Sequence, residues 1–291
     1  MAAVHQPPIT EVRRAVAVAL AEDLLPLGDL TAALLPAGAE VTAAFVPRDD
    51  GVLAGTACAT EAFAQLDPAV IVEWSADDGA SVTAGSTIGT VSGSLASILT
   101  AERTALNFLN HLSGVATLTR RFVDAARAGG GSARVWDTRK TTPGLRSLEK
   151  AAVRAGGGWN HRGNLSEWVM FKDNHLARLG VEEAVRTARA TWPARTIHVE
   201  ADSIDKVEAA LAAGADAILL DNLGVDGVAE AVAIADAHVA RRGGKRPLLE
   251  ASGGVTLDTI GAYAATGVDV VSSSQITLSA PVLDIGLDIG P

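Results

Sequence analysis

Two basic residues, Arg139 and Lys140, stand side by side in the segment DTRKTTPG. The chain of 291 residues carries a net charge of −10, yet residues 137–175 contain seven lysines and arginines against four acidic residues. Three of the five lysines of the chain lie in this stretch, at Lys140, Lys150 and Lys172. Such a local excess of positive charge indicates groups that bind an anionic ligand.

These cations fall into two groups by their expected local structure. Lys150 and Arg154 lie four residues apart in LRSLEKAAVRAG, a helical pattern, and we interpret them as part of a solvated helix face. Arg139, Lys140, Arg162 and Lys172 lie in turns or at a strand end, where binding groups are more often held. The second group therefore forms the candidate site.

The elements that must position this group alternate between strands and helices. Six short apolar runs are typical of buried strands and lie at residues 133–138, 168–172, 196–201, 216–221, 247–252 and 268–273. Helical patterns separate them, and this alternation predicts a parallel sheet, open or closed into a barrel.

Each of these runs ends in polar residues, a pattern that becomes meaningful when it repeats six times. The residues are Asp137 with Arg139 and Lys140, then Lys172, Glu200, Asp221, Glu250 to Gly254, and Ser272 to Ser274. In α/β barrels, residues at the carboxyl ends of the strands gather on one rim, where substrates bind. The rim would hold cations first, carboxylates next, and glycine and serine turns last.

The last two parts of the rim suit a phosphorylated substrate. Ser252, Gly253 and Gly254 precede a helix expected at about residues 256–265, and unpaired N–H groups at a helix start bind phosphate. Glu200 and Asp221 are oxygen ligands suited to Mg²⁺ on a polyphosphate, and the alternative is that both form salt bridges with local arginines. The six histidines show no zinc spacing, and the sequence has neither a Walker A loop nor a dinucleotide fingerprint.

The amino-terminal third reads as a separate α+β segment. A helix is expected over residues 9–23 and another over 56–66, with short apolar runs between and after them. A long helical stretch over residues 94–128 is expected to break at Ser113 and Gly114. The piece DDGASVTAGSTIGTVSG resembles a biotinyl or lipoyl carrier, but the modifiable lysine is absent between Arg48 and Arg103.

Composition excludes several classes of protein. The acidic balance argues against a nucleic-acid surface, and Cys58, the only cysteine, excludes a disulfide framework. The sequence shows no signal peptide and no membrane-length apolar run, so we expect a cytoplasmic location. No convincing nucleophilic triad is present, although Lys172 at a strand end leaves a Schiff-base aldolase or lyase as an alternative.

The segment DTRKTTPGLRSLEKAAVRAGGGWNHRGNLSEWVMFKDNH, with AERTALNFLNHLSGVAT before it and HVEA, ILLDNL and LEASGG after it, resembles the quinolinate phosphoribosyltransferases. The resemblance spans nearly the whole chain. It implies an N-terminal α+β open sandwich domain over residues 1–115, to which a tail at residues 276–291 returns. It also implies an irregular α/β barrel with fewer than eight βα units over residues 116–275.

The resemblance implies a reaction as well. Phosphoribosyl would be transferred from phosphoribosyl pyrophosphate to quinolinate with decarboxylation and with Mg²⁺, giving nicotinate mononucleotide, pyrophosphate and CO₂ for NAD biosynthesis. A nicotinate phosphoribosyltransferase or the molybdenum-associated paralogue group remains a neighbouring alternative. A non-enzymatic carrier is the alternative from another class.

The family pattern assigns roles residue by residue. Arg139, His161, Arg162 and Lys172 would bind the two quinolinate carboxylates, with Arg103 supplied by the partner in a homodimer whose further assembly is open. Lys140, beside Thr138, would face the phosphoribosyl donor, and Glu200 and Asp221 would face its ribose and Mg²⁺-bound pyrophosphate. The 5′-phosphate would lie on Ser252, Gly253, Gly254, Ser273 and Ser274.

Two positions depart from the family pattern, and one position has a local argument of its own. Where the family reads SVGALTHS this chain reads SSSQITLS, so Ser274 replaces a glycine and Leu278 a histidine. Arg103 lies in an apolar helical segment that we expect to pack on both sides, so it needs an anionic partner. The partner subunit's substrate would be one such anion, and an internal pair with Glu102 is the alternative.

Overall fold

The computed structural model describes residues 6–290, which form two compact units. The first unit comprises residues 6–120, 140–157 and 276–290, and the second comprises residues 121–139 and 158–275. The expected domain boundary between residues 115 and 116 stays a prediction. The contacts assign residues 140–157 to the first unit, whereas the expected division had placed them in the barrel.

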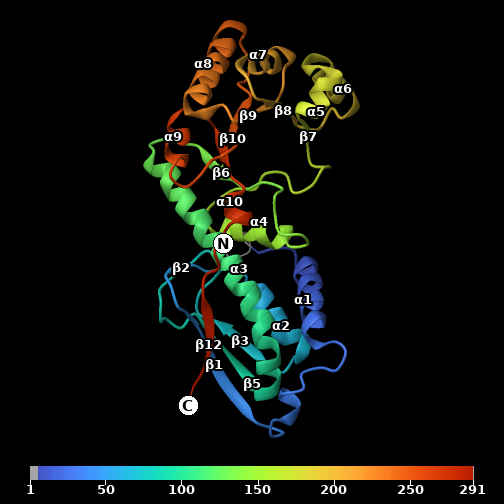
Figure 1. The fold of residues 1–291 in the computed structure, drawn as a ribbon, viewed down its shortest axis with the longest axis vertical. Helices are drawn as coiled ribbons and strands as arrows, with labels where there is room; N and C mark the ends of the chain where they lie inside the picture. Colours follow the sequence, from blue (N-terminus) through green and yellow to red (C-terminus); the bar gives the residue numbers. More distant parts are fainter. Residues whose placement is uncertain (1–5, 291) are drawn as a thin grey trace. The chain divides into compact units, whose positions relative to one another are not determined.

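The first unit contains an antiparallel sheet and the helices around it (Figure 1). Its elements are α1 (Ile9–Leu24), the 3-10 helix η2 (Ala32–Leu34), β1 (Glu40–Pro47), β2 (Gly51–Val52), α2 (Thr56–Leu66), β3 (Ile71–Trp74), β4 (Ser81–Val82), β5 (Gly89–Ser94), most of α3 (Leu95–Ala128), α4 (Arg146–Ala155), most of α10 (Gln275–Leu278) and β12 (Ile285–Ile289). The strand order is β12-β1-β5-β3, so the chain's last strand pairs with its first. This separate sheet confirms the expected α+β domain.

The long helix α3 corrects one expectation. It runs without interruption from Leu95 to Ala128, so the predicted break at Ser113 and Gly114 is wrong. The Ser113 hydroxyl bonds to the backbone of Ala54, and a Cβ on Gly114 would lie 2.0 Å from the Pro281 carbonyl oxygen. Gly114 is therefore needed for a close backbone approach within the helix and does not end it.

Helix α4 corrects a second expectation. Lys150 is only 7% exposed and Glu149 is fully buried, so the helix does not present a solvated charged face. Glu149 accepts a hydrogen bond from the Thr142 backbone and lies 2.8 Å from His111 Nε2 on α3. The buried charge of Glu149 therefore has a partner on another helix, which a helical pattern cannot reveal.

The second unit is built on six parallel strands. These are β6 (Arg134–Trp136), β7 (Val169–Phe171), β8 (Ile197–Ala201), β9 (Ala217–Asp221), β10 (Leu248–Ser252) and β11 (Val270–Ser272), in the order β6-β11-β10-β9-β8-β7. The connecting helices are α5 (Asp173–Leu179), α6 (Val181–Thr191), α7 (Ile204–Ala213), α8 (Gly224–Arg242) and α9 (Ile260–Ala265). All six expected strands are confirmed.

The sheet curls until side chains from its two edge regions meet. Trp136 at the end of β6 has its ring centroid 6.2 Å from that of Trp168, which directly precedes β7 at the other edge. The segment between them closes the gap, because Trp136 also forms a parallel bridge with Trp159. Six strands closed in this way confirm the irregular α/β barrel with fewer than eight units. No helix of residues 6–290 combines the length and the apolar character that a membrane span requires.

Candidate active site

The register of the strands sorts the inward side chains of the barrel into layers. His198, Ala217 and Leu248 share the lowest level, near the amino ends of the strands. Glu200, Leu219 and Glu250 form the next level, and Asp221 and Ser252 form the level at the carboxyl ends. Side chains two residues apart point to the same face of a strand, so these layers stack along the barrel interior.

The carboxyl ends bring two predicted groups into contact. Lys172 Nζ forms an ion pair with Glu200 Oε2, which joins the ends of β7 and β8. Asp221 at the end of β9 accepts a hydrogen bond from the Asn222 side chain, and the Asn222 backbone donates to the Ser252 carbonyl at the end of β10. The predicted rim therefore contains Lys172, Glu200, Asp221 and Ser252 on adjacent strands.

A buried aspartate holds the loop that carries His161 and Arg162. Asp137 is fully buried, and its carboxylate accepts hydrogen bonds from the His161 backbone at 2.8 Å and from the Asn160 side chain at 2.6 Å. Sequence reasoning counted Asp137 only as a strand-end residue. Its role is to fix the position of the binding loop, because a buried carboxylate needs such donors.

Arg162 is held in a buried, positively charged environment. Its side chain is 6% exposed, and its Nε atom has no hydrogen-bond partner among residues 6–290. Burial lowers the pKa of the Arg162 guanidinium, and the charge of Arg139 lowers it further, whereas Glu167 and Glu250 oppose the shift. Arg139 and Arg162 repel each other, and the guanidinium of Arg162 is also buried. A bound anion would therefore stabilise this pair.

The barrel interior contains a cluster that the sequence did not reveal. Glu250 Oε2 lies 3.4 Å from His161 Nε2 and 3.5 Å from His198 Nε2, and all three residues are buried. Burial opposes ionisation of Glu250, but the closeness of His161, and to a smaller extent of His198 and Ser272, outweighs it and lowers the pKa of the carboxyl. Burial also lowers the pKa of His198 to about 4, although the charge of Glu250 acts in the opposite direction.

The histidines show no zinc spacing in the sequence, yet the fold places two of them beside one carboxylate. The ligand atoms of His161, His198 and Glu250 all lie within 4.8 Å of one another. We interpret the group as a cluster of close charged contacts that orients His161, because both imidazole nitrogens lie within 3.5 Å of the same carboxylate oxygen. One sequence signal could have pointed to this cluster. Side chains alternate between the two faces of a strand, and this places His198 and Glu250 on the inward face of apolar strands.

The glycine turn after β10 has a steric requirement of its own. Gly253 has a φ of +90°, and a Cβ there would lie 2.3 Å from Asn222 Oδ1, while Gly254 has a φ of +62° and open space. Helix α9 begins only at Ile260 and has six residues, so the expected helix start just after Gly254 is wrong. Any phosphate contact here would come from the turn itself and not from a helix terminus.

The serines after β11 are partly used by the fold. The Ser273 hydroxyl donates to the Val255 carbonyl at 3.0 Å, which ties the two glycine and serine turns together. Ser274 is half-buried beside it, and Leu278 is 54% exposed in α10.

Two further predicted site residues, Thr138 and Arg139, are half-buried in the segment that follows β6.

Two predicted site residues belong to the first unit. Lys140 is exposed there, and its carbonyl accepts a 2.7 Å hydrogen bond from the Thr277 hydroxyl. Arg103 is exposed on α3 and has no carboxylate within 4.0 Å among the described residues. The internal pair with Glu102 is therefore wrong, whereas the packing of this helical segment on both sides stays a prediction.

The donor set at the carboxyl ends fits Mg²⁺ carried by a polyphosphate. Glu200 and Asp221 offer carboxylate oxygens on neighbouring strands, and the one three-residue metal-ligating group found among residues 6–290 lies elsewhere. Mg²⁺ is commonly held by one or two carboxylates together with substrate phosphates. The arrangement as a whole can therefore hold a carboxylate dianion next to a phosphorylated donor.

Comparison with known proteins identifies the family. The family model for the quinolinate phosphoribosyl transferase C-terminal domain matches residues 115–288, and that for its N-terminal domain matches residues 29–113. The chain is 44% identical over 280 residues to the nicotinate-nucleotide pyrophosphorylase (carboxylating) of Mycobacterium leprae, covering 93% of this chain and 94% of that protein. It is 38% identical over 297 residues to quinolinate phosphoribosyltransferase (decarboxylating) 1b of Nicotiana tabacum, covering 97% and 83%.

Solved structures agree with the sequence comparison. The nicotinate-nucleotide pyrophosphorylase of Francisella tularensis superposes with a TM-score of 0.90 at 36% identity, covering 99% of each chain. Both the fold and the sequence similarity extend over the full length, which decides against the carrier and the Schiff-base lyase. The predicted resemblance is confirmed, and the chain belongs to the quinolinate phosphoribosyltransferase family of enzymes.

Proposed function

We propose that this enzyme transfers phosphoribosyl from phosphoribosyl pyrophosphate to quinolinate, with loss of CO₂, to form nicotinate mononucleotide and pyrophosphate. The observation that carries the proposal is the buried Arg162 beside Arg139, on a rim that also contains Lys172. Two neighbouring guanidinium groups suit a ligand with two neighbouring carboxylates, as quinolinate has on its pyridine ring, because each guanidinium can bind a carboxylate bidentately.

The residues of the barrel would act mainly by position and charge. Arg139, Arg162, His161 and Lys172 would hold quinolinate so that its ring nitrogen faces the anomeric carbon of the donor. The turn at Ser252 to Gly254, with Ser273 and Ser274, would hold the 5′-phosphate. Glu200 and Asp221 would hold Mg²⁺, whose charge would stabilise the departing pyrophosphate.

The chemistry proposed for these residues requires no nucleophilic side chain. The C–O bond to pyrophosphate breaks, the ring nitrogen bonds to the anomeric carbon, and the resulting pyridinium accepts the electron pair left when the adjacent carboxylate departs as CO₂. The contact of Lys172 with Glu200 supports a charged binding role for this lysine over a role as an amine nucleophile.

A substrate panel tests the proposal directly. Purified protein with phosphoribosyl pyrophosphate and Mg²⁺ should form product with quinolinate and not with nicotinate or nicotinamide. Faster turnover of nicotinate than of quinolinate would contradict the two-carboxylate assignment. Omission of Mg²⁺, with chelator present, should abolish turnover.

The two carboxylates of the donor site need separate tests, because Glu200 contacts Lys172 and Asp221 does not contact it. By calorimetry, Asp221→Asn should lose Mg²⁺-dependent donor binding and retain quinolinate binding. Glu200→Gln should weaken both, since it also releases Lys172. Normal donor binding by Asp221→Asn would remove Asp221 from the metal site.

We further propose a homodimer in which Arg103 of one subunit completes the site of the other. Arg103 is exposed on α3, and the exposed leucines 27 and 30 belong to a segment that Asp29 ties to Thr100 of the same helix through a 3.0 Å hydrogen bond. Leu27 and Leu30 are exposed apolar side chains, and Arg103 has no carboxylate partner among the described residues. Both features suit a surface that is covered by a second subunit.

Subunit mixing tests this arrangement. When Arg103→Ala and Lys172→Ala subunits are mixed, half of the randomly assembled dimers are mixed and each has one site with both residues intact, so about a quarter of wild-type activity should return. Activity that stays at the level of the parents, after mass spectrometry has verified exchange, would show that Arg103 does not act in trans.

A further inference from the structure

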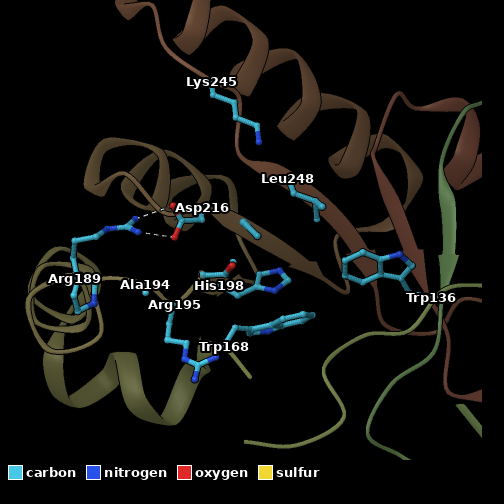
Figure 2. A pocket seen from close by; sticks show the side chains of 12 residues that line it. Trp136, Trp168, Arg189, Ala194, Arg195, His198, Asp216, Lys245 and Leu248 are labelled. Carbon is cyan, nitrogen blue, oxygen red and sulfur yellow. Dashed lines mark hydrogen bonds and ion pairs between the residues drawn. The ribbon is translucent and has the colours of Figure 1, made fainter. Parts of the chain in front are cut away.

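The barrel has a cavity that is separated from the predicted site residue His161 by the rings of Trp136 and Trp168. It has a volume of about 510 Å³, within the range of small-molecule sites, and Figure 2 shows the side chains that line it. Its floor includes Trp168 and Trp136, with His198 and Leu248. His198 and Leu248 belong to the lowest layer of inward residues, so the cavity opens at the amino ends of the strands.

The wall of this cavity is basic in a protein that is acidic overall. Arg189, Arg195 and Lys245 line it together with one carboxylate, Asp216. That carboxylate is already bound by Arg189, whose two terminal nitrogens lie 2.8 and 2.9 Å from its oxygens. The charge of Arg189 is therefore balanced within the wall, as the dashed lines in Figure 2 show.

The other two cations are left to face solvent and the cavity. Neither Arg195 nor Lys245 has a carboxylate within 4.0 Å among the described residues, and both are exposed. Arg195 donates a 3.2 Å hydrogen bond from one terminal guanidinium nitrogen to the Glu167 carbonyl, which holds the group beside Trp168. The cavity thus has two cations more than its own carboxylate can neutralise, and an anion would supply the missing charge.

The floor of the cavity favours a flat, aromatic occupant. The rings of Trp136 and Trp168 have centroids 6.2 Å apart and an interplanar angle of 37°. The indole Nε1 atoms of both residues are buried and have no hydrogen-bond partner among residues 6–290. Because these nitrogens are not accessible from the cavity, the two rings offer an occupant an aromatic, apolar surface.

We propose that this cavity is a second ligand site, which binds a small planar aromatic carboxylate. Its carboxylate would be held by Arg195, which lies beside Trp168, and its ring would lie on the surface formed by Trp136 and Trp168. Lys245 faces the cavity from the opposite side and would add to its positive potential. A phosphate is a poorer match, because the lining residues include no glycine turn that would direct backbone N–H groups at it. His198 lies between this cavity and Glu250, so the site is distinct from the rim at the carboxyl ends.

The test is calorimetric titration with 2-naphthoate and, as the neutral comparison, 2-naphthamide. We expect one 2-naphthoate to bind per subunit and the amide to bind at least about tenfold more weakly, since a charge-assisted hydrogen bond is lost. The double variant Arg195→Gln/Lys245→Gln should lose at least about tenfold in 2-naphthoate affinity. The matched control is Arg186→Gln/Lys206→Gln, which removes two exposed cations that pair with Glu183 and Asp202 outside the cavity and should bind as wild type.

Two further measurements separate this site from the proposed active site. Arg162→Ala should retain 2-naphthoate binding, and Arg195→Gln/Lys245→Gln should retain turnover of quinolinate. If turnover and the far-UV circular dichroism of the double variant are both lost, Arg195→Gln alone decides by the same titration. Equal binding of acid and amide, wild-type affinity in the double variant, or loss of binding in Arg162→Ala would each overturn the proposal.

Discussion

The antiparallel sheet of the first unit and the barrel of the second unit enclose different kinds of side chain. Beneath the antiparallel sheet of the first unit, Phe45 stacks on Trp74 with ring centroids 4.7 Å apart and meets Phe63 edge-on at 6.2 Å. Inside the barrel of the second unit, His161, His198 and Glu250 occupy the corresponding buried positions. The first interior provides stability, whereas the second uses buried polar groups to orient a ligand, at some cost in stability.

The largest expected effect of a substitution is in the apolar interior. Phe45 is fully buried, so Phe45→Ala should lower the free energy of unfolding by about 3 to 5 kcal/mol through lost burial and the cavity left behind. Catalytic efficiency of the folded protein should be unchanged. Chemical denaturation measures the first quantity and initial rates the second. The control is Ile71→Ala on β3 of the same sheet, where the side chain is 61% exposed and the loss should be small.

A substitution in the polar interior of the barrel should lower activity and not stability. Arg162→Ala should reduce kcat/KM for quinolinate by about 2 to 5 kcal/mol in transition-state terms, because a buried charge pair loses one partner. The free energy of unfolding should stay the same or rise, since Arg139 loses a like-charged neighbour. Arg186→Ala, which removes an exposed arginine of α6, is the control. Unchanged efficiency in Arg162→Ala would remove this residue from the site.

The barrel interior should also be the part that is sensitive to acid. His198 has a folded pKa of about 4 against an ordinary value of 6.5, because of burial and despite the opposing charge of Glu250; His161, Arg162 and Lys172 add to the lowering. Between pH 4 and pH 6.5, His198 is protonated in the unfolded chain and neutral in the folded chain. The stabilisation is therefore complete above pH 6.5 and falls by up to about 3 kcal/mol as the pH approaches 4.

Denaturation at several pH values between 4 and 7 measures this loss. His198→Gln should flatten the profile in that range, whereas His238→Gln on α8, outside the buried cluster, should leave it unchanged. A wild-type profile that is already flat between pH 6.5 and 4 would be inconsistent with a neutral, buried His198.

A smaller effect is expected from the carboxylate that both histidines share. Glu250→Gln keeps the shape of the side chain and removes its charge, so we expect kcat/KM to fall by about 1.5 to 3 kcal/mol, the contribution of a hydrogen bond to a charged group. Because Glu250 acts through His161, the pH profile of kcat/KM should change as well. Glu250→Asp should restore part of the activity. An altered stability with an unchanged pH profile would indicate a structural role only.

The contrast between the two interiors also explains what the sequence could predict. The six barrel strands were found because each is an apolar run that ends in polar residues, and that pattern is local. The cluster of His198 and Glu250 was not found, because residues 52 positions apart are brought together only by the curl of the sheet. The same reason applies to Lys150 in α4, whose burial depends on the packing of the first unit.

Glycines show the same limit at single positions. Gly253 was correctly placed in a turn beside the predicted rim, because a glycine after a strand is a local signal. Gly114 was taken as a helix break, although it permits the Pro281 carbonyl to approach an unbroken helix. A sequence shows that a glycine is present, but the contact that requires it comes from a distant segment.

The smallest expected effect concerns the response of the apolar interior to alkali, opposite in direction to the acid response of the barrel. Burial raises the pKa of the Cys58 thiol from 9.0 to about 12, and the charges of Asp78 and Glu61 add to it. The unfolded chain releases this proton above pH 9 and the folded chain keeps it, so the stabilisation is complete below pH 9 and is lost as the pH rises. At pH 10 the loss should be about 1 kcal/mol. Cys58→Ala should remove this part of the difference in unfolding free energy between pH 8 and pH 10. The other titrating groups are the same in both proteins, so their contribution to this difference serves as the control.

The native Cys58 thiol should also resist a disulfide reagent at pH 8 until denaturant is added, because the thiolate is the reactive form. Rapid labelling of the native protein, or the same pH dependence with and without the thiol, would contradict a sealed apolar interior around Cys58.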